Sequence, residues 1–202
     1  IPVNPPHTMN RGQAELKRLE GAVTDTITAP VPEWPWRGTG TCAPDAAVKA
    51  GGAQSLCLAA AAPGKSVDAF QTVPVGQTEA KALVVRASIR ARDLTGVGDA
   101  DCSVYVDLVH ADGTPLYCQA IPIAADTREF QVVERRIVSD KPFAGATVHL
   151  LLRGSHTGTV WFDDLFLGEE GSTVNLLKNP GLEGAAEKGA VALEAEGDVG
   201  HG

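Results

Sequence analysis

Alternation of apolar and polar residues limits the fold of this chain more than any other feature. In the stretch LVVRASIRAR, residues 83–92, Leu, Val, Ala, Ile and Ala occupy the odd-numbered positions, while Val, Arg, Ser, Arg and Arg occupy the even-numbered ones. Successive side chains of a β-strand point to opposite faces of its sheet. The pattern therefore predicts a strand that has one face on a core and the other toward water.

Seven further stretches are strand-like, and Gly, Pro and Asp turns separate them. They are residues 53–60, 68–75, 102–110, 115–123, 129–139, 146–154 and 159–168. The only helical candidate is RGQAELKRLEG, residues 11–21, which could equally lead into a strand. Strands at this spacing, without amphipathic helices between them, predict an all-β chain that folds as an antiparallel β-sandwich or jelly roll.

Charge and hydropathy argue against two classes of partner. The formal net charge is −8. A protein that binds nucleic acid needs clustered Lys and Arg to neutralise phosphates, so we expect no such partner. No apolar run approaches the roughly 20 residues that a membrane span requires. The first residues, IPVNPPHTMN, resemble no secretory signal and include no initiator Met, so we interpret the chain as a processed or excised piece of a longer precursor.

Four cysteines, Cys42, Cys57, Cys102 and Cys118, have no zinc-site spacing. An even count in a lysine-poor chain indicates an exported protein with one or two disulfides, and the alternative is four buried thiols in a cytosolic protein. Cys42–Cys57 is the easier bridge, because the segment between them can fold back. A hairpin turning at residues 112–113 leaves Cys102 and Cys118 on the order of 13 Å out of register, whereas a disulfide spans about 7 Å.

Several phrases of the chain, taken in order, resemble a known protein family. They are EWPWRGTGT (33–41), GGAQSLCLAA (51–60), FQTVPVGQTEAKALVVRASIRA (70–91), HADGT (110–114), TREFQVVERRIV (127–138) and GTVWFDDLFLG (158–168). Together they resemble the jelly-roll carbohydrate-binding modules that bind xylan and β-glucan and have the galactose-binding-domain-like fold. The resemblance covers about residues 20–168. It implies a non-catalytic module of a secreted or cell-surface protein, with a polysaccharide or glycan as its partner.

The resemblance divides the chain into an N-terminal arm (1–19), a β-sandwich (20–168) and a C-terminal extension (169–202). The extension contains NLLKNPGLEG, residues 175–184, which has the form of the phrase that usually opens such modules, although it follows the closing strand. Three explanations stay open. A second module begins there, the segment folds back onto its own sandwich, or it is donated to a neighbouring copy by strand exchange.

Candidate ligand-binding residues fall into two groups. Trp34 and Trp36 are flanked by prolines and are expected either to form a platform for a sugar ring or to cap the core. The solvent faces of the central strands could hold the hydroxyl groups of a glycan or an acidic sugar, or could simply be solvated. The residues concerned are Arg86, Arg90, Tyr105, Asp107, Tyr117, Gln119, His149 and Arg153.

A structural Ca²⁺ is a further expectation. Alternation in the last strand turns Asp163, next to Asp164, toward the core edge, where a carboxylate is costly unless it is paired. The resemblance implies that an aspartate of this strand helps to hold calcium, which Glu20 or Glu183 and backbone carbonyls could complete. The ordinary alternative is hydrogen bonding of the aspartate to loop amides.

No catalytic motif accompanies these residues. The sequence has no Gly-x-Ser-x-Gly, no His-Glu-x-x-His and no phosphate-binding glycine loop, and its five histidines are dispersed. We therefore expect no enzyme. The hypothesis is a carbohydrate-binding module outside the cell or on its surface. The alternative is a structural subunit of an extracellular fibre, joined to copies of itself through residues 175–183.

Overall fold

The structure is a computed structural model that describes residues 34–125 and 127–184. The described residues form ten strands and no helix, so no helix among them could cross a membrane. The predicted arm, the helical candidate 11–21 and Glu20 lie outside the described residues. The strands are β1 (Arg37–Thr39), β2 (Cys42–Asp45), β3 (Ser55–Ala60), β4 (Val67–Pro74), β5 (Leu83–Arg92), β6 (Cys102–His110), β7 (Pro115–Pro122), β8 (Gln131–Ile137), β9 (Phe143–Leu152) and β10 (Gly158–Glu169).

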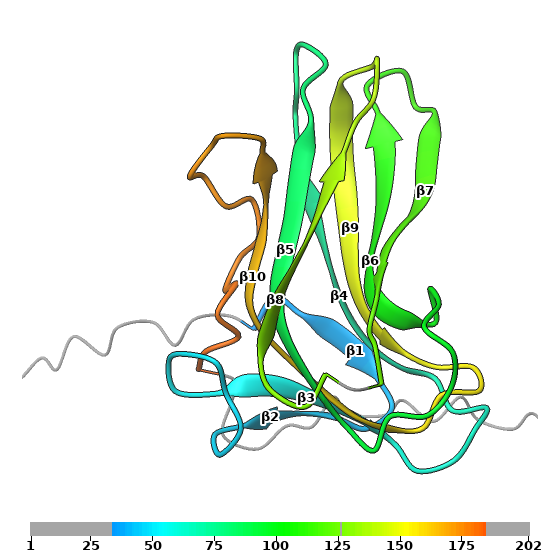
Figure 1. Cartoon of the computed structure of the whole chain (residues 1–202). Coiled ribbons are helices and arrows are strands. Elements are labelled where there is room, and N and C mark those ends of the chain that lie inside the picture. Colours follow the sequence, from blue (N-terminus) through cyan, green and yellow to red (C-terminus); the bar gives the residue numbers. More distant parts are fainter. Residues whose placement is uncertain (1–33, 126, 185–202) are drawn as a thin grey trace, which may run out of the picture. The chain divides into compact units, whose positions relative to one another are not determined.

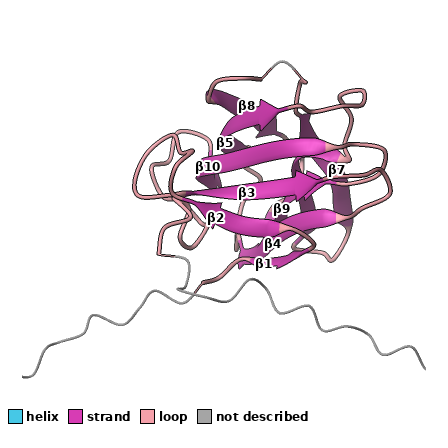
Figure 2. Cartoon of the chain, turned by 90° about the horizontal axis from the view of Figure 1, so that it is seen from below, coloured by secondary structure: helices cyan, strands magenta, loops and turns pink. Residues whose placement is uncertain are grey.

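The ten strands build two antiparallel sheets of five strands each, which confirms the predicted β-sandwich (Figure 1). One sheet has the order β1-β4-β9-β6-β7, and the other has the order β2-β3-β10-β5-β8. In Figure 2 the second sheet lies in front of the first. All eight predicted strands are present, with ends that differ by up to three residues. The short strands β1 and β2 were not predicted, because three or four residues are too few to show a period.

The predicted alternation explains the core. All five odd-numbered side chains of β5 are buried. Val104 and Val106 of β6 and Val148 and Leu150 of β9 are buried in the same core from the other sheet. Removing one large aliphatic side chain from water stabilises the fold by about 1.5–3 kcal/mol. The hydrophobic core between the two sheets is therefore the main source of stability.

The structure does not contain the predicted Cys42–Cys57 disulfide. Strands β2 and β3 pair Cys42 with Leu58 and Ala43 with Cys57. Side chains of directly paired residues share a face, and neighbours along a strand point to opposite faces. Cys42 therefore points into the core with Leu58, while Cys57 points to the outer face. All four cysteines are free thiols.

The segment that follows β10 returns along that strand and packs on its own sandwich. Pairing of β3 with β10 ends at Phe162, and the peptide N–H of Leu165 donates instead to the Pro180 carbonyl at 2.8 Å. Farther along, the Leu176 N–H donates to the Leu167 carbonyl at 2.8 Å. The segment thus takes the place beside β10 that β3 leaves open, although its backbone is irregular and not the strand that was expected.

Both sheets hold this returning segment. The Gln71 side chain of β4 accepts a hydrogen bond from the Lys178 N–H at 2.7 Å and donates one to the Lys178 carbonyl at 2.9 Å. Leu177 and Leu182 are buried in the common core. In this chain the segment therefore folds back onto its own sandwich, which is the second of the three arrangements considered. Donation to another copy would have to break these contacts.

Candidate functional site

The outer face of the first sheet brings together aromatic and polar side chains. Register places Phe70 of β4, His149 of β9 and Tyr105 of β6 in one row across three strands. The next row contains Thr72, Thr147 and Asp107. Tyr117 of β7 lies beside the second row. We call the surface formed by these seven residues the aromatic face.

The first row is a packed set of rings. The ring centroids of Phe70 and His149 are 5.6 Å apart, and those of Tyr105 and His149 are 5.8 Å apart in an edge-on arrangement. Burial lowers the pKa of His149 below its usual 6.5, whereas the nearby carboxylates of Asp107 and Asp68 act in the opposite direction. The imidazole is therefore neutral near pH 7 and has one hydrogen-bond donor and one acceptor.

The second row borders a shallow groove of about 180 Å³. Thr72, Asp107, Tyr117 and Thr147 are among its lining residues. The hydroxyl groups of Thr72 and Thr147 are hydrogen-bonded to each other at 3.0 Å. Tyr117 is 63% exposed, an unusual state for a large aromatic side chain on a sheet. The groove is smaller than a typical ligand pocket of roughly 300–1,000 Å³, so it would hold only part of an extended ligand.

A β-bulge positions Tyr117 and Asp107. Pairing of β6 with β7 shifts between Val106 and Leu108, and Cys118 on β7 has a φ of 61°. The Cys118 N–H donates to Asp107 Oδ1 at 3.2 Å. Bulges re-aim side chains and often lie next to functional sites. Here the bulge fixes the carboxylate of Asp107. Burial, followed by the nearby Asp107 and Cys118, raises the pKa of Tyr105, so its hydroxyl stays protonated.

The structure does not bring all eight candidate strand residues together. Tyr105, Asp107, Tyr117 and His149 share the aromatic face. Arg153 follows β9 and forms an ion pair with Asp101 at 2.8 Å. Phe70, Thr72 and Thr147 were not predicted as site residues, although the alternation in residues 68–75 and 146–154 already placed them on polar faces.

Three of the predicted residues lie elsewhere, which corrects the idea of one surface. The side-chain oxygen of Gln119 accepts from Arg135 of β8 at 3.1 Å, so Gln119 helps to close the edge between the sheets. Arg86 and Arg90 are on β5 of the other sheet, where their guanidinium groups lie over Phe166 and Trp161 at 4.9 and 5.8 Å from the ring centroids. Alternation predicted the outward phase of Arg86 and Arg90 but not the sheet to which their strand belongs. For Gln119, the bulge at Cys118 changed the phase, and the residue pairs with the inward Val106.

The predicted tryptophan platform is also corrected. Trp36 is 2% exposed, and its indole N–H donates to the Asn179 carbonyl at 3.2 Å. Trp34 is partly buried and packs against the same core. A fully buried ring cannot stack on a sugar, so Trp36 follows the alternative reading, in which it caps the core.

The aspartates of β10 show how the loop before β3 is held. Asp163 is 1% exposed, and its Oδ2 accepts from the N–H groups of Ala50 and Gly51 at 2.8 and 3.1 Å. Its Oδ1 accepts from the Asp164 N–H at 2.8 Å. For Asp163 the structure thus shows the ordinary alternative, hydrogen bonding to loop amides, which leaves it poorly suited to hold a cation.

Glu183 joins the same loop from the returning segment. Its Oε1 accepts from the Ala53 N–H at 2.8 Å. Burial raises the pKa of Asp164, as do the charges of Asp163 and Glu183 nearby. Among the described residues no group of three or more His, Cys, Asp or Glu side chains has the placement of a metal site.

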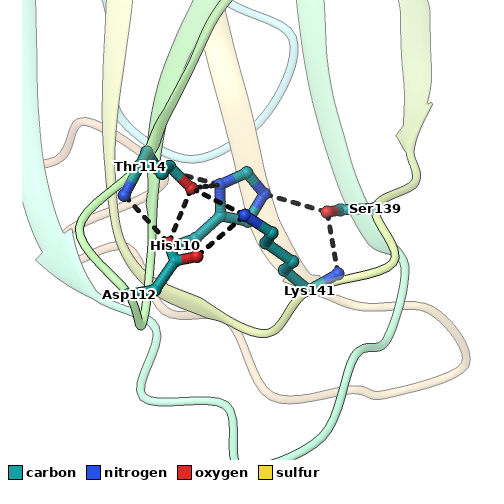
Figure 3. Close-up of polar contacts among 5 residues, drawn as sticks. All are labelled: His110, Asp112, Thr114, Ser139 and Lys141. Atoms are coloured by element: carbon teal, nitrogen blue, oxygen red, sulfur yellow. Dashed lines mark hydrogen bonds and ion pairs between the residues drawn. The ribbon is translucent and has the colours of Figure 1, made fainter.

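A buried histidine organises a second polar cluster at the β6–β7 turn (Figure 3). His110 Nδ1 is 2.8 Å from the Thr114 carbonyl, and its Nε2 is 2.9 Å from the Ser139 hydroxyl. Ser139 also accepts from the Lys141 N–H at 3.0 Å, and the Lys141 ammonium group pairs with Asp112 at 2.8 Å. The ring of His110 is 8% exposed and stacks on a core phenylalanine. The Ser–His contact therefore ties the turn to the β8–β9 connection.

Comparison with solved structures finds neighbours of low similarity. A xylan-binding CBM22-1 domain of Paenibacillus barcinonensis Xyn10C is 12% identical with a TM-score of 0.46, over 68% of this chain and 87% of that one. A family 16 carbohydrate-binding module is 15% identical with a TM-score of 0.41, over 67% and 86%. A tailspike protein of bacteriophage CBA120 is 11% identical with a TM-score of 0.46, over 67% of this chain but only 19% of the tailspike.

Most of these neighbours are carbohydrate-binding modules of families 22, 4 and 16, the group that the sequence resembles. Identities to these structures are 11–16%, and their TM-scores are 0.41–0.47. No protein-family profile matches the chain. No curated protein matches it either.

Proposed function

We propose that this chain is a non-catalytic module that binds a polysaccharide through the aromatic face. The observation that carries this proposal is the exposed ring of Tyr117 beside a groove lined by hydroxyl and carboxylate groups. A pyranose ring has apolar C–H faces and a rim of hydroxyls. Such a ring stacks on an aromatic face, while a few directed hydrogen bonds fix its orientation.

The aromatic face favours a neutral glycan. Its groups near the groove are tyrosine and threonine hydroxyls, the neutral imidazole of His149 and the Asp107 carboxylate, which can accept from sugar hydroxyls. Several neighbours bind xylan or were solved with xylohexaose. We therefore propose β-linked neutral polysaccharides, with xylan first, as ligands of a secreted or cell-surface protein.

The absence of catalysis is part of the proposal. A glycosidase needs two carboxyl groups about 5–10 Å apart, one on each side of the scissile bond. On this face Asp107 accepts from the Cys118 N–H, and Asp68 at the other edge accepts from the Thr39 hydroxyl. Asp107 is the only carboxylate among the residues that line the groove, so the pair that a glycosidase needs is not present there. Release of reducing sugar from a polysaccharide that the chain binds would contradict this part.

Affinity electrophoresis of the full chain in gels that contain soluble xylan or mixed-linkage β-glucan tests the proposal. We expect retardation, and we expect Tyr117→Ala to weaken binding roughly tenfold, equivalent to about 1.4 kcal/mol. Tyr117→Phe keeps the ring and should keep most of the affinity. Val138→Ala, at a residue 59% exposed on another part of the surface, is the control. Equal retardation of Tyr117→Ala and the parent chain would contradict the assignment.

A structural Ca²⁺ beside Asp164 and Glu183 is a separate proposal. Its support is the approach of these carboxylates, reflected in the raised pKa of Asp164. Calcium that binds only the folded state raises the thermal midpoint, and above the dissociation constant the stabilisation grows with the logarithm of its concentration. An equal midpoint in excess Ca²⁺ and in chelator would show that loop amides alone hold these carboxylates.

Assembly through strand exchange is the alternative function. It requires residues 175–183 to leave their own sandwich and to occupy the equivalent place beside β10 of another copy. If they do so, the full chain forms concentration-dependent oligomers, and a chain that ends at Gly168 does not. A monomer over a wide range of concentration in light scattering would contradict exchange and agree with the packing observed in the single chain.

A further inference from the structure

A second pocket lies on the other sheet, at the end of β5. It has a volume of about 480 Å³, within the range of pockets that take small molecules. Arg90, Arg92 and Leu94 line one side, and Arg128 and Glu129 line the other. The two sides are joined by a hydrogen bond from the Ala91 N–H to the Thr127 carbonyl at 2.6 Å. A backbone hydrogen bond thus connects the two segments that line the pocket.

The charge of the pocket is opposite to that of the chain. Its lining has three arginines, Arg90, Arg92 and Arg128, and two carboxylates, Asp93 and Glu129, while the whole chain has a net charge of −8. The contact between Arg92 and Asp93 is 4.0 Å long, and both side chains are mostly exposed. An ion pair of this kind contributes little. The guanidinium groups therefore keep most of their capacity for an external anion.

Two of the arginines are held by one aromatic ring. The guanidinium groups of Arg90 and Arg92 lie 5.8 and 5.1 Å from the ring centroid of Trp161. Trp161 is 3% exposed, and its indole N–H donates to Asp45 at 2.8 Å. Because the ring cannot move freely, the two cations are arranged before any ligand arrives, which lowers the entropy cost of binding.

Arg90 also has an unfilled hydrogen-bond donor. Its Nε is buried, and no acceptor among the described residues reaches it. A buried donor without a partner destabilises the fold, and more so when the group is charged. A guanidinium that has lost part of its water without gaining an acceptor is attracted to an anion more strongly than a fully hydrated one.

From these contacts we propose that the pocket binds a carboxylate carried on a sugar-sized ring, that is, a hexuronate as the free acid or as a unit of an acidic polysaccharide. The planar fork of a guanidinium matches a carboxylate through two parallel hydrogen bonds. A pocket of about 480 Å³ has room for such a ring. The site is independent of the aromatic face, which belongs to the other sheet.

Isothermal titration of the full chain tests this site with four probes: glucuronate, an oligogalacturonate, glucose and inorganic sulfate. We expect glucuronate to bind and glucose not to bind, and we expect affinity for glucuronate to fall as salt is added. Tighter binding of the oligogalacturonate than of glucuronate would identify the polymer as the source, and equal binding would identify the free acid. Sulfate that binds as tightly as glucuronate would overturn the proposal, because only the charge would then be recognised.

Variants locate the site. Arg128→Gln changes an exposed side chain and should weaken glucuronate binding at least tenfold, and Arg90→Gln should weaken it similarly. The matched control is Arg136→Gln, because Arg136 pairs with Glu170 outside the pocket. Tyr117→Ala should leave glucuronate binding unchanged, which separates this site from the aromatic face. Glucuronate binding that survives both Arg128→Gln and Arg90→Gln would refute the proposal.

Discussion

Trp36 shows how one residue can serve the core within a polar, proline-rich sequence. Its ring is 2% exposed, and its N–H reaches the returning segment at Asn179. Truncation of a buried Trp leaves a cavity and usually costs about 3–5 kcal/mol. The flanking prolines and Arg37 give no sign of this burial. The alternation signal was absent here because β1 has only three residues.

We predict that Trp36→Ala lowers the free energy of unfolding by about 3–5 kcal/mol, because it removes both the packing and the contact with Asn179. Urea denaturation of the full chain measures this loss. Val174→Ala, at a residue that is 64% exposed, should change the stability by less than about 0.5 kcal/mol. A loss at Trp36 no larger than at Val174 would contradict the burial of the ring.

A pH dependence follows from His149. Its pKa in the fold is lowered, first by burial and further by Arg153, while Asp107 and Asp68 act to raise it. As pH falls below about 6.5, the unfolded chain takes up this proton before the folded chain does, so the folded state loses relative stability. Above that pH both states are neutral, and the effect is absent.

We therefore predict that stability falls between about pH 6.5 and pH 5, and that His149→Gln makes this fall smaller. Urea denaturation of both chains at several pH values in this range measures the two slopes. His110 and His156 are also buried and remain in the variant, so they serve as a shared background. Identical slopes for the variant and the parent would contradict the lowered pKa.

At the scale of elements, the returning segment of residues 170–184 acts as a missing strand. It fills the place beside β10 where β3 has ended, and Gln71 attaches it to the other sheet. Asp164 has a φ of 47° and forms a bulge in β10. The bulge lies where the pairing of β10 with β3 ends and its contact with the returning segment begins. A phrase that opens related modules can therefore follow the closing strand, because it still lies beside that strand in space.

We predict that Leu182→Ala destabilises the full chain by about 2–5 kcal/mol, since Leu182 is fully buried in the core. The change should act on the sandwich as a whole, so thermal unfolding should remain a single transition at a lower temperature. Lys178→Ala is the control, because only its backbone makes the hydrogen bonds to Gln71. A Leu182→Ala chain as stable as the parent would show that the segment is not part of the fold.

For the whole molecule, the four cysteines are free thiols, so no disulfide among the described residues contributes to the stability of the sandwich. About 150 residues suffice without such a bond, since a domain of that size buries roughly two-thirds of its unfolded surface. Burial raises the pKa of Cys42 and Cys102 to about 12 and that of Cys57 to about 11. These thiols are protonated at neutral pH and therefore react slowly.

We predict that a chromogenic thiol reagent modifies only Cys118 quickly in the native chain and all four cysteines after denaturation. Cys118 is the exposed one. A reducing agent should leave the thermal midpoint unchanged. Cys118→Ser is the control and should abolish the fast phase. Fewer than four reactive thiols in denaturant, or a lower midpoint after reduction, would indicate a disulfide.

Bulges at Cys118 and Asp164 change the phase within β7 and β10, and only the structure located them. The sequence by itself determined that the chain forms two-faced strands, and it predicted the phase of the regular ones, such as residues 83–92, 102–110 and 146–154. It could do so because alternation is a local property: each side chain points opposite to its neighbour wherever the strand lies. The same alternation identified Tyr105, Asp107, Tyr117 and His149 as outward-facing.

Only the tertiary structure decided which outward faces share a surface. Strand β4 pairs with β9, and β10 lies between β3 and β5, so neighbours in space are distant in sequence. The register of such pairs put Phe70, His149 and Tyr105 in one row, moved Arg86 and Arg90 to the other sheet, and turned Cys42 and Cys57 to opposite faces. Pairing between distant strands depends on the packing of the whole core, which no single stretch of the sequence contains.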